Sequence, residues 1–312
     1  MNSETTPAAT HACEALQSAD YPRARELYGQ LLEEHPEDPD YSTGFYAAGY
    51  WANRSDSIKA MRSGRQLAGY LVSEWEKFEE QATGRDLTAS PAFPAAMKSV
   101  LGRAAEEFRL AFQEEGTSGA DLKLLKDLSL CLLRISDYRN AIDILQYARR
   151  INAADAEVLF LLAEALSSAQ AEDTAGRERY RDAFYLSPAS IQPAFIASEP
   201  ASTVLKELHK KFDGDLETVR EWFGAYFLLG AGLLRPPPSV MIQEIEKEMD
   251  RLMQNLERIA ERFQLRVRAR LAFYLLILLS VPEKEGKRTL EEKLRLIAPE
   301  IYSLYIEKRS SF

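Results

Sequence analysis

Four segments of the chain share one spacing of small and large apolar residues, and this repetition limits the folds that the chain can adopt. The clearest segment carries Tyr138, Ala141, Leu145 and Ala148, which fall on one face of a helix. Corresponding positions are held by Leu101, Ala104, Phe108 and Ala111, by Tyr21, Ala24, Tyr28 and Leu31, and by Asp173, Gly176, Tyr180 and Ala183. A two-helix hairpin that is apolar on several faces cannot bury them alone, so we expect neighbouring hairpins to stack.

Helix-compatible stretches precede these stripes, and they carry large apolar residues together with a small one. The positions are Leu125, Leu128, Ser129 and Leu132 in one stretch and Leu159, Leu162, Ala163 and Leu166 in the next. This arrangement resembles the tetratricopeptide repeat family, whose unit is a helix–turn–helix of about 34 residues. The resemblance implies an all-α fold, a solenoid of stacked hairpins with a helical C-terminal extension. It also implies that Ala141 and Gly176 face a neighbouring helix.

The distribution of helix breakers predicts two regions. Residues 1–198 are expected to form the solenoid, with a loop insertion near 83–96 where prolines disfavour a helix. Because helices in hairpins come in pairs, a long helical stretch within this region is expected to break near Gly64, or else one helix is an addition to the paired pattern. Residues 199–312 are expected to form a C-terminal helical region with a break at 235–239, where three prolines stand in a row. Within it, Asp215 is a candidate N-cap and Pro299 is expected to interrupt the last helix.

Charge and hydropathy exclude several classes of partner. The chain has 39 Lys and Arg against 48 Asp and Glu, a net charge of -9, so a general nucleic-acid surface is not expected. The most apolar run, residues 271–281, covers about 16 Å as a helix, which is too short for a transmembrane segment. Cys13 and Cys131 predict no disulfide framework. No signal peptide is recognisable, which favours a cytoplasmic location, or a periplasmic one if a leader has been removed.

The sequence contains no recognisable catalytic or metal-binding motif. It has three histidines, no paired cysteines, no phosphate-binding glycine loop and no nucleophile elbow. His35 lies among carboxylates, but a polar turn explains it better than a cation site. We therefore expect no enzymatic activity, no cofactor and no metal.

Binding residues follow only from the family resemblance, in which the first helices of successive units line a groove. Projected onto this chain, the groove residues are Lys123, Lys126, Leu130, Arg134, Phe160, Glu164 and Ser167. Lys126 and Arg134 are placed to pair with an acidic peptide or a C-terminal carboxylate. The competing interpretation is that these are ordinary solvated side chains.

Two further patterns leave alternatives open. Apolar residues alternate at steps of three and four along residues 242–263, at Ile242, Ile245, Met249, Leu252, Leu256, Ile259 and Phe263. This seam predicts either a homo-oligomer interface or packing on the following helix, residues 267–281. Aromatic residues also cluster, at Tyr46, Tyr50 and Trp51 and at Tyr70, Trp75 and Phe78. They are either interface anchors or core between repeats.

Together these features favour a non-enzymatic scaffold or adaptor that binds a protein or peptide through its groove. One alternative is a self-assembling structural protein that oligomerises through residues 242–263. The other is a small-ligand-binding accessory protein of a bacterial transport system.

Overall fold

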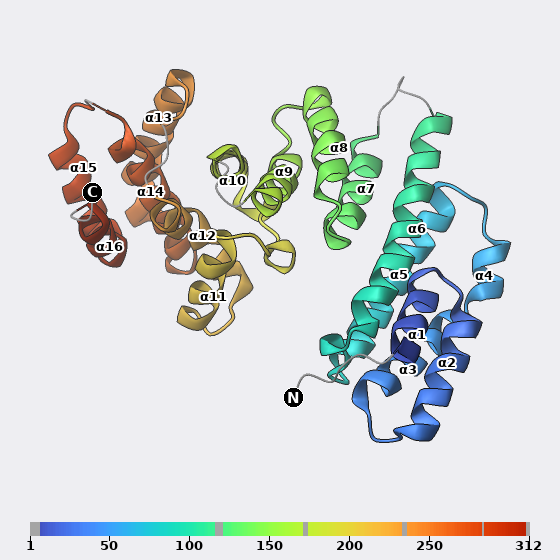
Figure 1. Cartoon of the computed structure of the whole chain (residues 1–312). Helices are drawn as coiled ribbons and strands as arrows, with labels where there is room; N and C mark the ends of the chain where they lie inside the picture. Colours follow the sequence, from blue (N-terminus) through green and yellow to red (C-terminus); the bar gives the residue numbers. More distant parts are fainter. Residues whose placement is uncertain (1–6, 116–120, 171–173, 233–235, 283, 310–312) are drawn as a thin grey trace. The chain divides into compact units, whose positions relative to one another are not determined.

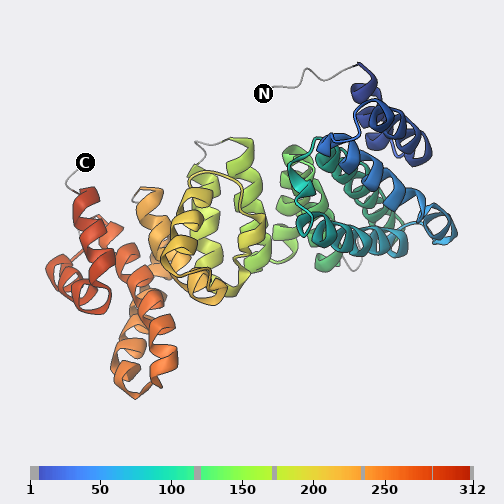
Figure 2. The same ribbon diagram turned by 90° about the horizontal axis from the view of Figure 1, so that it is seen from below.

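A computed structural model describes residues 7–115, 121–170, 174–232, 236–282 and 284–309. Within these ranges the secondary structure is helical and no strand occurs. Most helices lie beside the helix that follows them in sequence (Figure 1, Figure 2). The fold class is therefore all-α and solenoid-like, as the repeated spacing predicts.

Contacts between helices divide the chain into an N-terminal unit, Met1–Ile151, and a C-terminal unit, Asn152–Phe312. This division falls in the turn between two helices of the clearest repeat pattern. The regions 1–198 and 199–312 are defined by helix breakers and not by contacts, and they stay a prediction.

Helix α6 is the centre of the N-terminal unit, because it contacts α1, α3, α5 and α7 (Figure 1). The helices of this unit are α1 (Pro7–Gln17), α2 (Tyr21–Glu34), α3 (Pro39–Ala52), α4 (Ser55–Ala60), α5 (Arg65–Thr83), α6 (Ala92–Glu115), α7 (Leu122–Arg134) and α8 (Tyr138–Ile151). A short 3-10 helix, η1 (Leu87–Ala89), precedes α6. The contacts of α6 with α1 and α3 add a second layer to the simple succession of hairpins.

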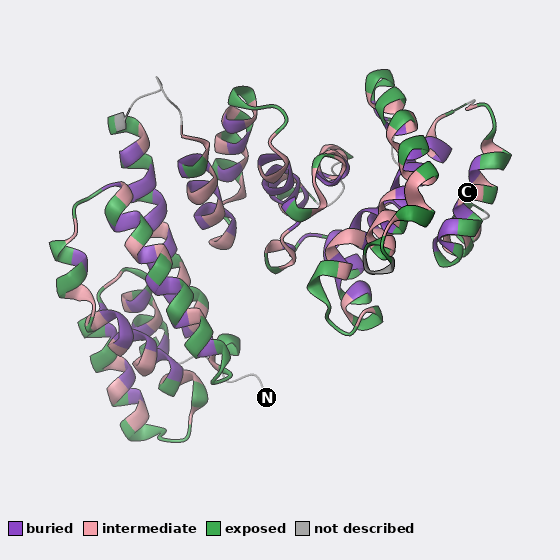
Figure 3. Ribbon diagram, turned by 180° about the vertical axis from the view of Figure 1, so that it is seen from behind, coloured by how far each residue is buried: buried purple, intermediate pink, exposed green. Residues whose placement is uncertain are grey.

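The C-terminal unit is organised around α12 and α14. Its α-helices are α9 (Ala156–Ala169), α10 (Thr174–Leu186), α11 (Ala201–Lys211), α12 (Leu216–Gly230), α13 (Ser239–Asn255), α14 (Glu261–Ser280), α15 (Lys287–Ile297) and α16 (Pro299–Arg309). Short 3-10 helices occupy Pro188–Ser190 (η3), Pro193–Phe195 (η4) and Leu256–Arg258 (η5). Helix α14 contacts α12, α13 and α15, and every residue of its apolar run 271–279 is buried (Figure 3). That run is the core of this unit. Among the described residues, no helix combines the length and apolar character that crossing a membrane requires.

Aspartates begin many of these helices by accepting hydrogen bonds from free backbone N–H groups. Asp215 accepts from the N–H groups of Glu217 and Thr218, which confirms it as the N-cap of α12. Asp155 caps α9 in the same way, immediately after the end of α8. The short "NAAD" turn can therefore separate two helices because its last residue starts the second one.

Small residues stand where helices cross closely. Ala141 is fully buried on α8, which packs on α7, and Gly176 is buried on α10, which packs on α9. A Cβ atom at Gly176 would lie 2.3 Å from the Oγ of Ser167. Gly44 on α3 is similar, since a Cβ there would lie 2.3 Å from ring atoms of Tyr28 on α2. The predicted close packing at Ala141 and Gly176 is confirmed; Asp173, at the head of the same stripe, lies outside the described residues.

Helix breaks agree with the sequence at three places and differ at two. The long stretch does break before Gly64, the last helix is interrupted at Pro299, and residues 236–238 of the 235–239 break are non-helical, while Arg235 lies outside the described residues. The loop predicted at 83–96 is shorter, because α6 begins at Ala92 and tolerates Pro94 in its first turn. The continuous helix implied by the 242–263 seam is also wrong, since α13 ends at Asn255 and α14 starts at Glu261.

Candidate functional site

Aromatic side chains from α3 and α5 meet in the core of the N-terminal unit. Trp51 and Trp75 are fully buried, and their rings stack with centroids 6.3 Å apart and planes 7° apart. Phe78 is also buried and contacts both rings. The core interpretation is thus confirmed for these three residues. Tyr46 and Tyr70, in contrast, are only half-buried.

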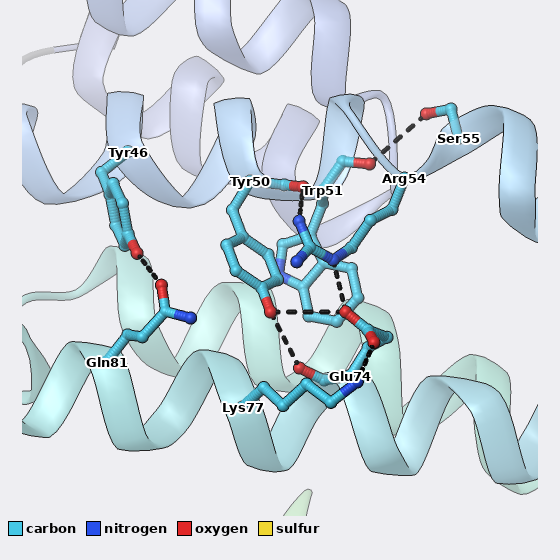
Figure 4. A network of polar contacts seen from close by, with 8 residues as sticks. All are labelled: Tyr46, Tyr50, Trp51, Arg54, Ser55, Glu74, Lys77 and Gln81. Atoms are coloured by element: carbon cyan, nitrogen blue, oxygen red, sulfur yellow. Dashed lines mark hydrogen bonds and ion pairs between the residues drawn. The ribbon is translucent and has the colours of Figure 1, made fainter.

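A polar network covers one edge of this aromatic cluster (Figure 4). Glu74 on α5 forms ion pairs with the Nε of Arg54 at 2.5 Å and the Nζ of Lys77 at 2.6 Å. A second nitrogen of Arg54 donates to the backbone carbonyl of Tyr50 at 3.0 Å, and the Tyr50 hydroxyl donates to the Glu74 carbonyl at 3.3 Å. Burial would raise the pKa of the Glu74 carboxyl, but the hydrogen bonds from Lys77 and Arg54 outweigh it and lower that pKa. The charge of Arg54 is therefore already compensated.

Beside this network lies an open groove of about 490 Å³, which we call the arginine–aromatic groove. Its lining comes from α2, α3, the turn after α3, α5 and the turn after α5. The lining residues are Arg25, Phe45, Tyr46, Gly49, Tyr50, Asn53, Arg54, Gln81 and Arg85. The Tyr46 hydroxyl donates to Oε1 of Gln81 at 2.8 Å, and this bond ties α3 to the end of α5 (Figure 4).

Three guanidinium groups in the groove each lie over an aromatic ring. Arg54 lies 3.4 Å from the centroid of Tyr50. Arg85 lies 4.8 Å from the centroid of Tyr46, and Arg25 lies 5.1 Å from that of Phe45. Cation–π contacts of this kind are worth about 0.5–1 kcal/mol at exposed sites. They hold flexible side chains in place before any ligand arrives.

The groove carries positive charge in a chain whose net charge is -9. None of its lining residues is acidic, and three are arginines. Arg25 and Arg85 are exposed, and within the described part of the chain neither makes an ion pair with a carboxylate. The arrangement can therefore bind an anionic group. It holds no nucleophile with an adjacent base, so we derive no reaction from it. No group of three or more potential metal ligands comes together among the described residues.

The groove residues predicted on α7 lie elsewhere in the N-terminal unit. Lys123 is exposed and forms an ion pair with Asp127 at 3.0 Å, while Lys126 and Leu130 are half-buried. Arg134 pairs with Glu79 and lies 5.8 Å from the ring centroid of Trp75. Its charge is therefore engaged inside the unit. A role for the other three in partner binding stays a prediction.

The three predicted groove residues on α9 are wrong, because all of them are core residues of the C-terminal unit. Phe160 is fully buried, Glu164 is 2% exposed and Ser167 is 5% exposed. Helix α9 is covered by α10 and by the segment that follows it, so the face that the family resemblance assigns to a groove is occupied here.

Glu164 ties α9 to the chain 33 residues later. Its carboxylate accepts hydrogen bonds from the backbone N–H groups of Ala197 at 2.8 Å and Ser198 at 2.9 Å. It also accepts from the hydroxyls of Ser198 at 2.8 Å, Ser168 at 3.1 Å and Tyr180. Burial and this carboxylate together raise the pKa of the Tyr180 hydroxyl well above its ordinary value. The residue is a buried structural acceptor.

The apolar residues of the predicted self-association seam, residues 242–263, differ in burial. Ile245 and Met249 are buried, and α13 packs on α14, which is the alternative that the sequence left open. Ile242, Leu252, Leu256 and Ile259 are half-buried, and Phe263 is 42% exposed on the next helix. The residues therefore form no single exposed stripe.

A second open cavity of about 470 Å³ lies in the C-terminal unit, between α11, α12 and α16. Its apolar lining is Val204, Leu229 and Leu304, and its charged lining is Glu207, Glu307 and Lys308. The two carboxylates outnumber the single ammonium, so the cavity lacks the uniform charge of the arginine–aromatic groove.

Comparison of the chain with known protein families, with curated proteins and with solved structures finds no match. The tetratricopeptide resemblance accordingly stays a prediction from the residue spacing.

Proposed function

We propose that the chain is a non-enzymatic scaffold of tetratricopeptide-like helical hairpins that binds a protein or peptide partner in the arginine–aromatic groove. The observation that carries this proposal is the groove itself, with three arginines stacked on three aromatic rings and no acidic lining residue. A cytoplasmic location and the absence of a nucleic-acid partner belong to the same proposal.

Preorganisation of the arginine side chains favours binding. Ordering a flexible side chain on binding costs about 0.5–1.5 kcal/mol, and here the guanidinium groups already lie over rings. Arg and Tyr are also the residues most often found at the energetic centres of protein interfaces. An open groove lined by both offers hydrogen-bond donors and apolar contact to an extended segment of a partner.

The self-assembly alternative loses support because Ile245 and Met249, the centre of its seam, are buried within the chain. The small-ligand alternative would use the cavity between α11, α12 and α16. That cavity is open and has mixed charge, which suits a small ligand less well than a closed apolar pocket does.

Selection from a library of random peptides displayed on phage, with the full chain as bait, tests the proposal. Recovered peptides are then measured against the unsubstituted chain, against the double variant Arg25→Gln/Arg85→Gln, and against Arg139→Gln as a matched control. The control makes the same substitution at an exposed arginine of the same unit that does not line the groove.

We expect recovered peptides to lose most of their affinity for the double variant and to keep it for the control. The proposal is overturned if no peptide is enriched. The groove assignment is overturned if enriched peptides bind the double variant as well as they bind the unsubstituted chain.

A further inference from the structure

We propose that the arginine–aromatic groove selects an acidic segment of its partner, with one carboxylate side chain paired to Arg25 and another to Arg85. This inference rests on the proposed function and names the chemistry of the partner. It follows from which charges in the groove are compensated, where the guanidinium groups lie, and which rings already have a guanidinium group over them.

The distribution of compensating charge separates Arg54 from the other two arginines. The Glu74 carboxylate forms an ion pair with Arg54 and compensates its charge, and the same carboxylate also pairs with Lys77. Arg25 and Arg85 make no such pair with any carboxylate in the described ranges. The positive charges of Arg25 and Arg85 are therefore available to a ligand, while Arg54 links the end of α3 to α5.

The position of the two guanidinium groups over rings favours carboxylates. A guanidinium group that lies over a ring keeps its N–H donors at its edge, where they can donate two parallel hydrogen bonds to a carboxylate. Arg25 reaches this position beside Gly49, where a side chain would lie 3.8 Å from its Nε. Phe45 and Tyr46, both half-buried, provide apolar contact between the two arginines for the side chains that separate the acidic residues.

Single-stranded nucleic acid is the main competitor, because phosphates also pair with arginine. Its bases, however, bind by stacking on free aromatic faces. In the groove Phe45, Tyr46 and Tyr50 each already have a guanidinium group over the ring, and Tyr46 also stacks on Phe78 with ring planes 18° apart. Two uncompensated arginines in a chain of net charge -9 provide little of the basic surface that nucleic acids require.

Fluorescence anisotropy with the full chain tests this inference. The probes are a fluorescein-labelled peptide of alternating Asp and Leu, its Asn–Leu counterpart, its Lys–Leu counterpart and a labelled single-stranded oligonucleotide. Each is titrated at low and at high salt with the unsubstituted chain, Arg25→Gln, Arg85→Gln, the double variant and the control Arg139→Gln, which changes an exposed arginine outside the groove. Far-UV circular dichroism of each variant checks that these exposed substitutions leave the helices intact.

We expect the Asp–Leu peptide to bind about tenfold more tightly than the Asn–Leu peptide, and the Lys–Leu peptide not to bind. Each single Arg→Gln variant is expected to weaken Asp–Leu binding about fivefold, because an exposed charged pair contributes modestly. High salt is expected to weaken it as well, and Arg139→Gln is expected to have no effect.

Three outcomes overturn the inference, and they differ in what they say about the proposed function. If the Asn–Leu peptide binds as tightly as the Asp–Leu peptide, and the double variant still abolishes binding, the groove binds peptides without selecting charge and the proposed function stands. Absence of Asp–Leu binding by the unsubstituted chain removes the acidic partner, while the library selection still decides the function. Tighter binding of the oligonucleotide, lost in the double variant, would replace the peptide with nucleic acid and overturn both.

Discussion

Replacement of Glu164 by Ala tests whether this residue is part of the core or of a binding surface. The substitution removes the acceptor of five hydrogen bonds, two of which come from the backbone of Ala197 and Ser198. In the folded chain these donors have few alternatives, because Ser198 and Tyr180 are buried. Each buried donor left without an acceptor costs about 1–3 kcal/mol.

Losses within one network are not additive, so we take the low end for the three buried donors, the N–H and hydroxyl of Ser198 and the hydroxyl of Tyr180. Ser168 and Ala197 are excluded because water can reach them. The expected loss in the free energy of unfolding of the C-terminal unit is then about 3 kcal/mol for Glu164→Ala. Glu164→Gln keeps one acceptor oxygen, and the Tyr180 and Ser198 hydroxyls can rotate to accept from its amide. We expect about 1–2 kcal/mol for that variant.

Urea unfolding followed by far-UV circular dichroism measures the loss, and hydrogen exchange at the amides of Ala197 and Ser198 locates it. Glu257→Ala, which removes an exposed carboxylate of the same unit, is the control and is expected to stay within about 0.5 kcal/mol. Unchanged stability and unchanged amide exchange in Glu164→Ala would refute the reasoning. Loss of partner binding without loss of stability would instead support the prediction that Glu164 lines a binding groove.

The remaining predictions concern the N-terminal unit. Gly44→Ala is expected to lower its free energy of unfolding by about 1–3 kcal/mol, because the added methyl group overlaps the ring of Tyr28; urea unfolding measures this. The lowered pKa of Glu74 means that its stabilising contribution is complete above its ordinary pKa of 4.5 and is lost as the pH falls through the folded value. Glu74→Gln should therefore flatten the acid limb of stability against pH, and an unchanged limb would contradict the assigned network. Burial raises the pKa of the Cys131 thiol to about 12, and Cys131 is 3% exposed, so a thiol reagent at pH 8 should modify Cys13 first and Cys131 only on unfolding. Equal rates for the two thiols in the folded chain would argue against the burial of α7.

The sequence predicts most of the helices, because helical periodicity and capping are local properties. Asp215 and the interruption at Pro299 are examples, since each depends only on the few residues around it. Close packing at Ala141 and Gly176 was also predictable, because only a small side chain recurs at that position.

Contacts between distant segments were not predictable in the same way. Glu164 was assigned to a surface because it lies on the expected groove face of its helix. No local pattern reveals that the chain returns at Ala197 and Ser198 to cover that face. The seam from Ile242 to Phe263 failed for a related reason, since its periodicity continues across a break between α13 and α14 that no Gly or Pro marks.

Only part of the arginine–aromatic groove can be predicted from the sequence. The cluster of Tyr46, Tyr50 and Trp51 was visible in the sequence, but Arg25 and Arg85 come from other helices and resemble ordinary solvated charges. Their importance arises from what surrounds them in the structure, namely rings beneath the guanidinium groups and no carboxylate nearby. Side-chain pairing across helices is information that one sequence does not contain.

The placement of the three tryptophans supplies an optical reporter that belongs to the molecule itself. Trp51 and Trp75 form a nearly parallel pair in the N-terminal unit, and Trp222 is the tryptophan of the C-terminal unit. Replacing Trp222 with Phe would leave an emission spectrum and an exciton signal from the first pair alone. Tyr50 lies edge-on to Trp51 at 5.2 Å, so a ligand that displaces Tyr50 should change the fluorescence without any attached dye.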